Sequence, residues 1–227
     1  MGIDPVSKGR KVCSFDCVYC QIGKTGFLTD QRRKLISTDE IIQELKSMPL
    51  FEPVNYVTFS GAGEPTLAVN LGDLIKAVKA VRKEKIAVIT NSSLMDHDDV
   101  WKDLSLADYV LAKFDAPDQR IFQKINAPCQ SIKFKNIIEG LKRFRAVCKG
   151  KFALQMMFID ENKDSAQEMA LIAREIRPHE IQINTPLRPC GVKPLSEFEI
   201  SEIEGYFEGM NTVSVYHSEK KKIIPVS

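Results

Sequence analysis

Residues 151–184 read KFALQMMFIDENKDSAQEMALIAREIRPHEIQIN, and this stretch indicates the architecture of the chain. Lys151 to Ile159 and Glu180 to Asn184 are short apolar runs with β-branched or aromatic residues, which predicts two buried strands. A helical pattern separates them. When a helix connects two strands of one sheet in this way, the crossover is right-handed and the strands run parallel. The stretch therefore predicts an α/β fold.

The same alternation recurs along the rest of the chain. The other expected strands are Arg10 to Val12, Val54 to Ser60, Ile86 to Thr90 and Asp108 to Phe114. Apolar residues at helical spacing follow at 41–48, 71–78 and 137–148. Ser37 and Ser196 each precede a glutamate by the spacing of a capping box, which predicts two helix starts.

About six strand-helix units result, whereas eight close a full barrel. We therefore expect a partial (β/α)6 TIM-like barrel, which is an open parallel sheet with outer helices. No linker divides the sequence, so residues 1–227 are expected to form a single domain.

The composition is that of a soluble globular protein, with 44% hydrophobic and 27% charged residues. The apolar runs are far shorter than the roughly 18 residues that cross a bilayer, so no membrane partner is expected. No secretory signal is visible, and a cytoplasmic location is expected. The formal net charge of +2 neither supports nor excludes nucleic-acid binding. The basic runs at residues 32–34 and 220–222 are interpreted as solvated surface.

Three of the six cysteines crowd into the segment Cys13-Ser-Phe-Asp-Cys17-Val-Tyr-Cys20. This crowding favours metal binding in a reducing compartment over disulfides. The spacing CxxxCxxC lets one loop wrap three corners of a cubane iron-sulfur cluster, for which thiolates are the usual ligands. Three ligands leave one metal position open. The alternative is a structural zinc site, completed by a distant Cys or His, in a zinc-stabilised binding module.

A small-residue loop follows the second strand, at the edge where parallel α/β folds bind ligands. It reads Ser60-Gly61-Ala62-Gly63-Glu64. Small residues let the backbone approach a ligand closely, and the carboxylate can meet a cation. A simple turn is the alternative.

Polar side chains also end the third and fourth strands. Asn91 and Ser92 either face a ligand or cap a helix that starts shortly afterwards. Lys113 interrupts an apolar strand near its end, where a buried lysine needs a partner. Asp115 lies two residues on, on the same face, and can be that partner in a structural ion pair.

The cysteine motif, with the aromatic Tyr19 directly before Cys20, resembles the signature of the radical SAM superfamily. The resemblance implies that Cys13, Cys17 and Cys20 bind a 4Fe-4S cluster. It further implies that S-adenosylmethionine chelates the fourth iron and is cleaved reductively to a 5′-deoxyadenosyl radical, which abstracts hydrogen from a substrate. A separate electron donor of the flavodoxin or ferredoxin type is then needed.

The loops at the strand ends fit the same family. Gly61-Ala62-Gly63-Glu64-Pro65 resembles its Gly-Gly-Glu-Pro motif, which contacts the methionyl ammonium, although Ala62 stands where a second glycine is usual. The resemblance also implies that polar groups on the third and fourth strands hold the ribose and carboxylate of the cofactor. The candidates are Asn91, Ser92, Lys113 and Asp115, and Lys113 is also a candidate catalytic residue.

The wider context resembles the iron-sulfur oxidoreductases related to wyosine-base-forming tRNA enzymes. The segments that carry this likeness are Asp4-Pro5-Val6, Phe114-Asp115-Ala116-Pro117-Asp118 and Asn184-Thr185-Pro186-Leu187-Arg188-Pro189. Wyosine synthases build a second cluster from upstream cysteines, and residues 1–12 contain none. The substrate therefore stays open between a tRNA base, a protein or peptide, and a small metabolite.

The three remaining cysteines differ in their expected positions. Cys148 extends an apolar helical stripe and is expected in the core. Cys129 and Cys190 follow the fourth and sixth strands and are expected on the ligand-binding side. Our hypothesis is that Cys190 faces the cavity and donates hydrogen to the substrate; the alternative is an incidental loop thiol.

Overall fold

A computed structural model describes residues 1–7, 9–48 and 54–218 of the chain. Its main element is a seven-stranded parallel sheet in the order β1-β4-β5-β6-β7-β8-β9. The strands are β1 (Gly2–Ile3), β4 (Tyr56–Phe59), β5 (Lys85–Thr90), β6 (Tyr109–Lys113), β7 (Lys151–Met157), β8 (Glu180–Asn184) and β9 (Thr212–Ser214). The expected α/β fold, an open partial barrel of parallel strands, is confirmed.

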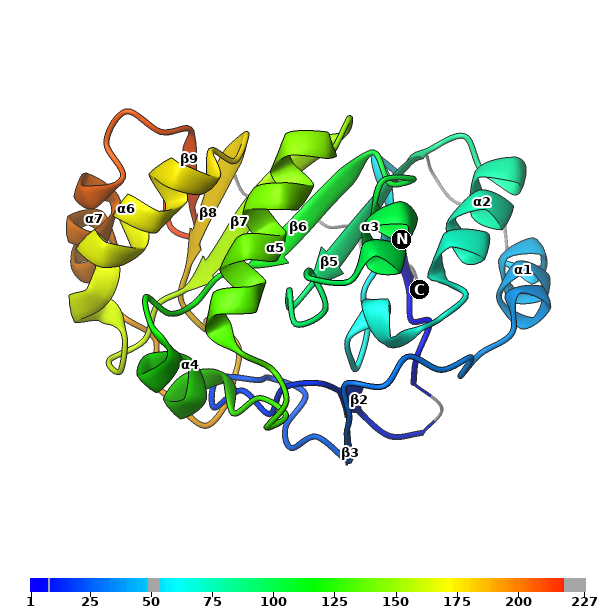
Figure 1. The fold of residues 1–227 in the computed structure, drawn as a ribbon, viewed down its shortest axis with the longest axis horizontal. Helices are drawn as coiled ribbons and strands as arrows, with labels where there is room; N and C mark the ends of the chain where they lie inside the picture. The colour runs from blue at the N-terminus through cyan, green and yellow to red at the C-terminus, as the bar shows by residue number, and fades with distance from the viewer. Residues whose placement is uncertain (8, 49–53, 219–227) are drawn as a thin grey trace.

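The helices lie along the outside of this sheet (Figure 1). They are α1 (Thr38–Ser47), α2 (Leu71–Val81), α3 (Asp98–Leu104), α4 (Gln119–Asn126), α5 (Phe134–Val147), α6 (Ala166–Ile176) and α7 (Glu197–Tyr206), with short 3-10 turns η1 (Pro65–Leu67) and η2 (Lys163–Ser165). Both predicted capping boxes are present, at Ser37 before α1 and at Ser196 before α7. The side-chain oxygen of each serine accepts the backbone N–H three residues on, which satisfies one free donor of the helix start.

At the ends of the sheet, one predicted strand was wrong and two strands were not predicted. The expected first strand, Arg10 to Val12, is replaced at the edge by β1, which pairs with β4. Instead β2 (Val12–Cys13) pairs with β3 (Phe27–Leu28) in a separate two-stranded sheet. The seventh strand, β9, was not predicted. Strands of two or three residues are too short to carry a periodic pattern, so only their partner strand reveals them.

The carboxyl ends of the strands share one edge of the sheet because every pair in it is parallel. The segment with β2 and β3 runs along that edge, near α4 (Figure 1). Backbone hydrogen bonds fasten it there: Val18 N donates to Ile125 O at 2.9 Å, and Asp16 N donates to Asn126 O at 3.0 Å. The cysteine loop is thereby held across the strand ends.

Arg33 and Lys34 are exposed as predicted, but the side chain of Arg32 is only 9% exposed, contrary to the prediction that residues 32–34 are solvated surface. Its guanidinium pairs with the carboxylates of Asp99 and Asp103, and it donates to Thr66 O and Ala68 O at 2.9 Å. A guanidinium can serve so many acceptors because it offers five N–H donors in one plane. It therefore joins α3 to the turn η1. The other basic run, 220–222, lies outside the described residues.

The apolar stripe of α5 packs into the core as predicted, with Ile137, Leu141 and Phe144 buried. Cys148 is only partly buried, because it is the C-cap of this helix and its backbone is extended. Its thiol lies 3.6 Å from Arg145 O. The expected core position for this cysteine is therefore only partly correct.

No helix in the described ranges is long and apolar enough to cross a membrane.

Gly140 and Gly205 form a matched pair for testing the packing of α5. A Cβ at Gly140 would lie 2.2 Å from Met95 O, whereas one at Gly205 in α7 would meet nothing within 4 Å. We expect Gly140→Ala to lower the free energy of unfolding by about 1–3 kcal/mol, because backbone must move to make room. Gly205→Ala should be neutral or stabilising by up to about 1 kcal/mol. Urea unfolding curves measure both, and equal stability of the two variants would contradict this packing.

Candidate functional site

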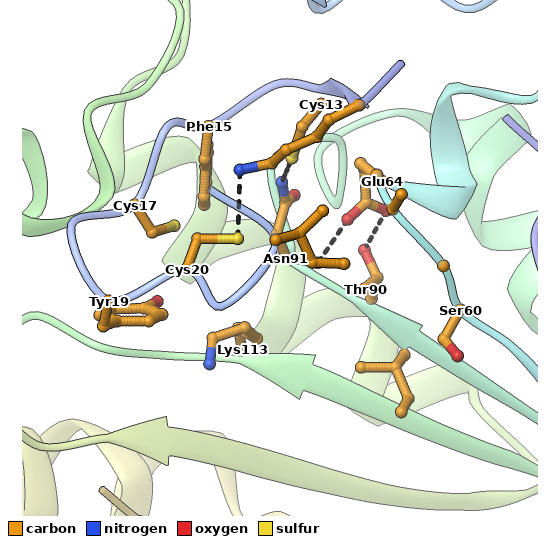
Figure 2. A pocket seen from close by; sticks show the side chains of 16 residues that line it. Cys13, Phe15, Cys17, Tyr19, Cys20, Ser60, Glu64, Thr90, Asn91 and Lys113 are labelled. Atoms are coloured by element: carbon orange, nitrogen blue, oxygen red, sulfur yellow. Dashed lines mark hydrogen bonds between the residues drawn. The ribbon is translucent and has the colours of Figure 1, made fainter. Parts of the chain in front are cut away.

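The predicted site residues gather around one cavity of about 170 Å³, here called the cluster cavity. All of them line it except Ser92, Asp115 and Cys190. Figure 2 shows Cys13, Cys17 and Cys20 on one loop that crosses the ends of the strands carrying Thr90 and Lys113. Lys11, Phe15, Ile22, Ile89 and Thr90 also line the cavity and were not predicted. Of these five, only Thr90 could have been predicted from the sequence, because it is a polar residue at the end of a strand, next to Asn91.

The thiols of Cys13 and Cys17 lie in surroundings that disfavour a free thiolate. Burial, and next the carboxylate of Glu64, raise the pKa of Cys13 to about 12. Burial also raises the pKa of Cys17. A thiolate in such a place needs a bound cationic centre to neutralise it. The donor set therefore fits a metal group better than a free nucleophile.

The arrangement of the loop also bears on the kind of metal group. Among the described residues, no group of three or more His, Cys, Asp or Glu side chains is arranged to hold a single metal ion. A zinc ion binds its sulfur ligands at about 2.3 Å and so draws them around one point. The three thiols instead line a shared cavity. A cavity lined by three thiols can hold an iron-sulfur cluster, for which thiolates are the usual ligands.

Gly61 and Gly63 are required by protein packing. A Cβ at Gly63 would lie 1.9 Å from Val12 O, and one at Gly61 would lie 2.2 Å from the Asp4 carboxyl carbon. Asp4 also accepts the N–H of Ala62 at 2.8 Å through Oδ2. We predicted that small residues serve the approach of a ligand. The structure shows that they serve the approach of the N-terminal segment and the cysteine loop, and the approach of a ligand stays a prediction.

Glu64 is 2% exposed and binds the end of β5 to the turn η1. Its Oε1 accepts from Thr66 N at 3.0 Å, Thr66 Oγ1 at 2.6 Å and Thr90 Oγ1 at 2.7 Å. Its Oε2 accepts from Asn91 N at 2.6 Å. Burial raises the pKa of Glu64, and these donors oppose that shift. Since a carboxylate oxygen can accept more than one hydrogen bond, Oε2 retains capacity for a cationic ligand group.

Asn91 and Ser92 do not cap a helix, contrary to the alternative raised from the sequence. Helix α3 begins at Asp98, and its N-cap residue His97 makes no side-chain cap. Asn91 Oδ1 accepts Ser93 N at 2.9 Å instead, in a local turn. Ser92 is fully buried, and its hydroxyl donates to Lys113 O at 2.8 Å. Asn91 therefore faces the cluster cavity, whereas Ser92 joins the ends of β5 and β6.

Asp115 is 4% exposed and is surrounded by donors. Oδ2 accepts the hydroxyl of Tyr19 and, at 3.1 Å, Asn126 Nδ2. Oδ1 accepts Met157 N at 2.8 Å. Asp115 does not line the cluster cavity. The carboxylate thus holds Tyr19, the end of α4 and the end of β7 in place, and it does so from behind the cavity wall.

Lys113 and Asp115 form the predicted ion pair, with Nζ 3.6 Å from Oδ1. Nζ also lies 4.9 Å from the centre of the Tyr19 ring, within the range of a cation–π contact. Burial and the Asp115 charge hold the pKa of Tyr19 well above its ordinary value, so its hydroxyl stays protonated and donates. Lys113 is therefore partnered and still faces the cavity.

A second cavity of about 610 Å³, here called the strand-end cavity, adjoins the first. Tyr19, Cys20, Ile22, Gly61 and Lys113 line both. The side chains found only in the larger cavity include Gln155, Met157, Asn184 and Arg188. They were missed as site residues, although Asn184 ends β8 and the rule that ligands bind at strand ends pointed there.

Cys190 lines neither cavity. Its thiol donates to Val192 O at 3.4 Å within its own loop. That loop does approach the cysteine motif, since a Cβ at Gly191 would lie 3.0 Å from Val18 O. Cys129 N donates to Ser14 O at 3.0 Å, which places Cys129 beside the cysteine loop. The role of Cys190 toward a substrate stays a prediction that no described contact supports.

Comparisons with known proteins agree with this geometry. The model of the Radical SAM superfamily matches residues 10–173, which include the cysteine loop and strands β4 to β7. The chain belongs to the radical SAM superfamily. Enzymes of this superfamily use a 4Fe-4S cluster and S-adenosylmethionine. The resemblance found in the sequence is thereby confirmed.

Within the superfamily, the chain is similar to a UPF0026 protein of Synechocystis sp. The two are 36% identical over 208 residues, which are 90% of this chain and 74% of that protein. The fold is similar to that of Streptococcus suis SuiB bound to S-adenosylmethionine, with TM-score 0.67 and 14% identity over 94% of this chain and 50% of that chain. It is also similar to archaeal TYW1, with TM-score 0.63 and 16% identity over 81% and 67%.

The hydroxyl of Tyr19 should contribute to stability because it satisfies a buried carboxylate. We expect Tyr19→Phe to cost about 1.5–3 kcal/mol, the range for hydrogen bonds to charged groups. Tyr206 offers a control, since the residue is 48% exposed and its hydroxyl makes no hydrogen bond with the described residues. Tyr206→Phe should change stability by less than about 0.5 kcal/mol. Anaerobic urea unfolding measures both, and a Tyr19→Phe chain as stable as the unchanged protein would contradict the assigned role of Asp115.

Proposed function

We propose that the chain binds a 4Fe-4S cluster through Cys13, Cys17 and Cys20 and binds S-adenosylmethionine beside it. The observation that carries this proposal is that the three thiols line the same cavity as the loop Gly61 to Glu64. Three protein ligands leave one iron open to a cofactor. When bound together, the two groups supply a 5′-deoxyadenosyl radical after one-electron reduction.

Different residues of the chain would then bind different groups of the cofactor. The Oε2 atom of Glu64 has capacity to accept the methionyl ammonium, and the Asn91 amide lines the wall beside it. Lys113 lies between the two cavities, where its ammonium can pair with a carboxylate while Asp115 and the Tyr19 ring fix its position. Ser60, Ala62 and Gly63 supply the backbone wall. Ser92 and Asp115 act as positioning residues.

The strand-end cavity would receive the substrate, because it adjoins the cluster cavity and is the larger of the two. Its chemistry allows a tRNA base, a peptide or a small metabolite, and hydrogen abstraction from one of these is the proposed reaction. A separate flavodoxin or ferredoxin would supply the electron. The six cysteines are all free thiols, which fits a reducing compartment and supports a cytoplasmic location. Residues 1–227 would act as one radical SAM core domain.

The test of this function begins with the anaerobically purified and reconstituted chain. Incubation with S-adenosylmethionine and a chemical reductant should yield 5′-deoxyadenosine, and deuterium transferred into it from a labelled candidate would identify the substrate. The second candidate function, a zinc-stabilised binding module, predicts zinc without acid-labile sulfide. Iron and sulfide analysis therefore separates the two functions.

Replacement of any one of Cys13, Cys17 and Cys20 by Ala should abolish the four-iron cluster and the cleavage of S-adenosylmethionine, because each thiolate binds a different iron. Cys148 is the matched control, since it lies at the end of α5 and lines neither cavity. Cys148→Ala should keep both properties. Iron content, sulfide content and 5′-deoxyadenosine are the measurements, and a full cluster in any of the three variants would sink the assignment.

Ala62→Val should weaken S-adenosylmethionine binding and leave the cluster assembled. Ala62 lines the cluster cavity, and its N–H is already fixed to Asp4, so added bulk cannot move away easily. We expect about a tenfold loss of affinity, the effect of about 1.4 kcal/mol. Equilibrium dialysis measures it, with iron content as the internal control. Unchanged affinity would mean that this loop does not contact the cofactor.

A further inference from the structure

Each sulfur atom of the cysteine loop accepts a hydrogen bond from a nitrogen on a different segment. The three pairs are Lys11 Nζ to Cys20 Sγ at 3.1 Å, Asn126 Nδ2 to Cys17 Sγ at 3.4 Å, and Asn91 Nδ2 to Cys13 Sγ at 3.5 Å. These are ordinary lengths for hydrogen bonds to sulfur. The donors come from the start of the loop, from the end of α4 and from the turn after β5. No single local motif therefore produces the arrangement.

Lys11 differs from the two asparagines because it carries a full positive charge. It is 8% exposed, although a lysine is almost never fully buried without a partner. Its other hydrogen bond goes to the neutral carbonyl of Gly23 at 2.8 Å. Among the described residues the facing carboxylate is that of Asp16, 4.0 Å away and 33% exposed. The Cys20 sulfur is thus the closest group that can become an anion.

We propose that these three donors, and above all the Lys11 ammonium, raise the reduction potential of the iron-sulfur cluster. The inference rests on the proposed function. Hydrogen bonds to the sulfur ligands and the net charge nearby set the potential of such clusters. In the step concerned the oxidised cluster gains one electron, and the external donor loses it. The reduced cluster carries one more negative charge, and the Lys11 ammonium stabilises that form. Lys11 therefore makes the reduction easier through its charge, without contacting the substrate.

The size of the effect should follow the charge of the donor. An amide N–H presents a dipole, whereas the Lys11 ammonium presents a full charge in partly buried surroundings, where screening by water is weaker. Loss of Lys11 should therefore lower the potential more than loss of Asn91 or Asn126. All three changes should act in the same direction.

The test is a redox titration of the full, reconstituted chain, followed by the electron paramagnetic resonance signal of the reduced cluster. Lys11→Met removes the charge and the donor at similar volume. Lys24→Met is the matched control, since Lys24 lies on the same loop but is exposed and makes no hydrogen bond or ion pair with the described residues. At the potential where the unchanged chain is half reduced, Lys11→Met should show about a tenfold lower ratio of reduced to oxidised cluster, which equals about 59 mV. Lys11→Arg and Lys24→Met should stay close to the unchanged chain.

The outcomes distinguish a failure of the proposed function from a failure of the inference about the reduction potential. An unchanged chain that assembles no cluster overturns the proposed function, and the inference with it. A normal cluster with the same potential in Lys11→Met overturns the inference alone. Should Lys11→Met assemble no cluster, Asn91→Ala and Asn126→Ala decide the matter: a downward shift of the potential in both supports the inference, and unchanged potentials in both overturn it.

Discussion

The buried carboxylate of Asp115 is the interaction on which the site depends. It lies just beyond the end of β6 and accepts hydrogen bonds from the cysteine loop, from the end of α4 and from the backbone N–H of Met157, the last residue of β7. A carboxylate taken out of water costs free energy unless donors replace the water. Here the donors belong to the cysteine loop, α4 and β7, which are the segments that must come together to form the site. The cost of leaving the carboxylate unsatisfied therefore enforces the geometry of the site.

On the other side of the cavity, the buried carboxylate of Glu64 also joins separate segments by accepting their hydrogen bonds. Its oxygens join the turn η1 to the end of β5, and the backbone N–H of Glu64 donates to Val12 O at 3.1 Å. The cysteine loop is consequently fastened at both ends, through Tyr19 to Asp115 and through Val12 to Glu64. Between these points its sulfur atoms receive donors from three segments. The loop has little freedom left, which suits a site that must hold a large inorganic group with few ligands.

The features that the sequence predicted are those that local patterns determine. The five longer strands, the capping boxes at Ser37 and Ser196, and the motif of three cysteines follow from periodicity and spacing over a few residues. The parallel sheet then required that strand-end loops meet the cysteines. The Lys113–Asp115 pair was also within reach, because the two residues lie on one face of a single segment.

The features that were missed depend on contacts between distant segments. Strands β1 and β9 exist only because a neighbouring strand pairs with them. The need for glycine at position 63 comes from the carbonyl of Val12, and the burial of Arg32 comes from two aspartates in α3. Lys11 and Asn126 resemble any other polar residues in the sequence. The proximity of Lys11 to the Cys20 sulfur appears only once the loop has folded back on itself, and that of Asn126 to the Cys17 sulfur only once α4 has packed against the loop.

This dependence on distant segments means that the cysteine loop is synthesised well before the residues that hold it in place. The cysteine loop leaves the ribosome early, but the residues that bond to it follow much later, as far as Cys129, whose backbone N–H donates to Ser14 O. At about 10 residues per second, the loop waits on the order of ten seconds for its last partner. During that interval its thiols are unsheltered and can bind stray metal ions or be oxidised. On the proposed function, we expect cluster insertion to come late in biosynthesis, after translation has passed Cys129. Cells that make the chain faster than they can deliver iron and sulfide should then accumulate it in an empty, oxidation-prone form.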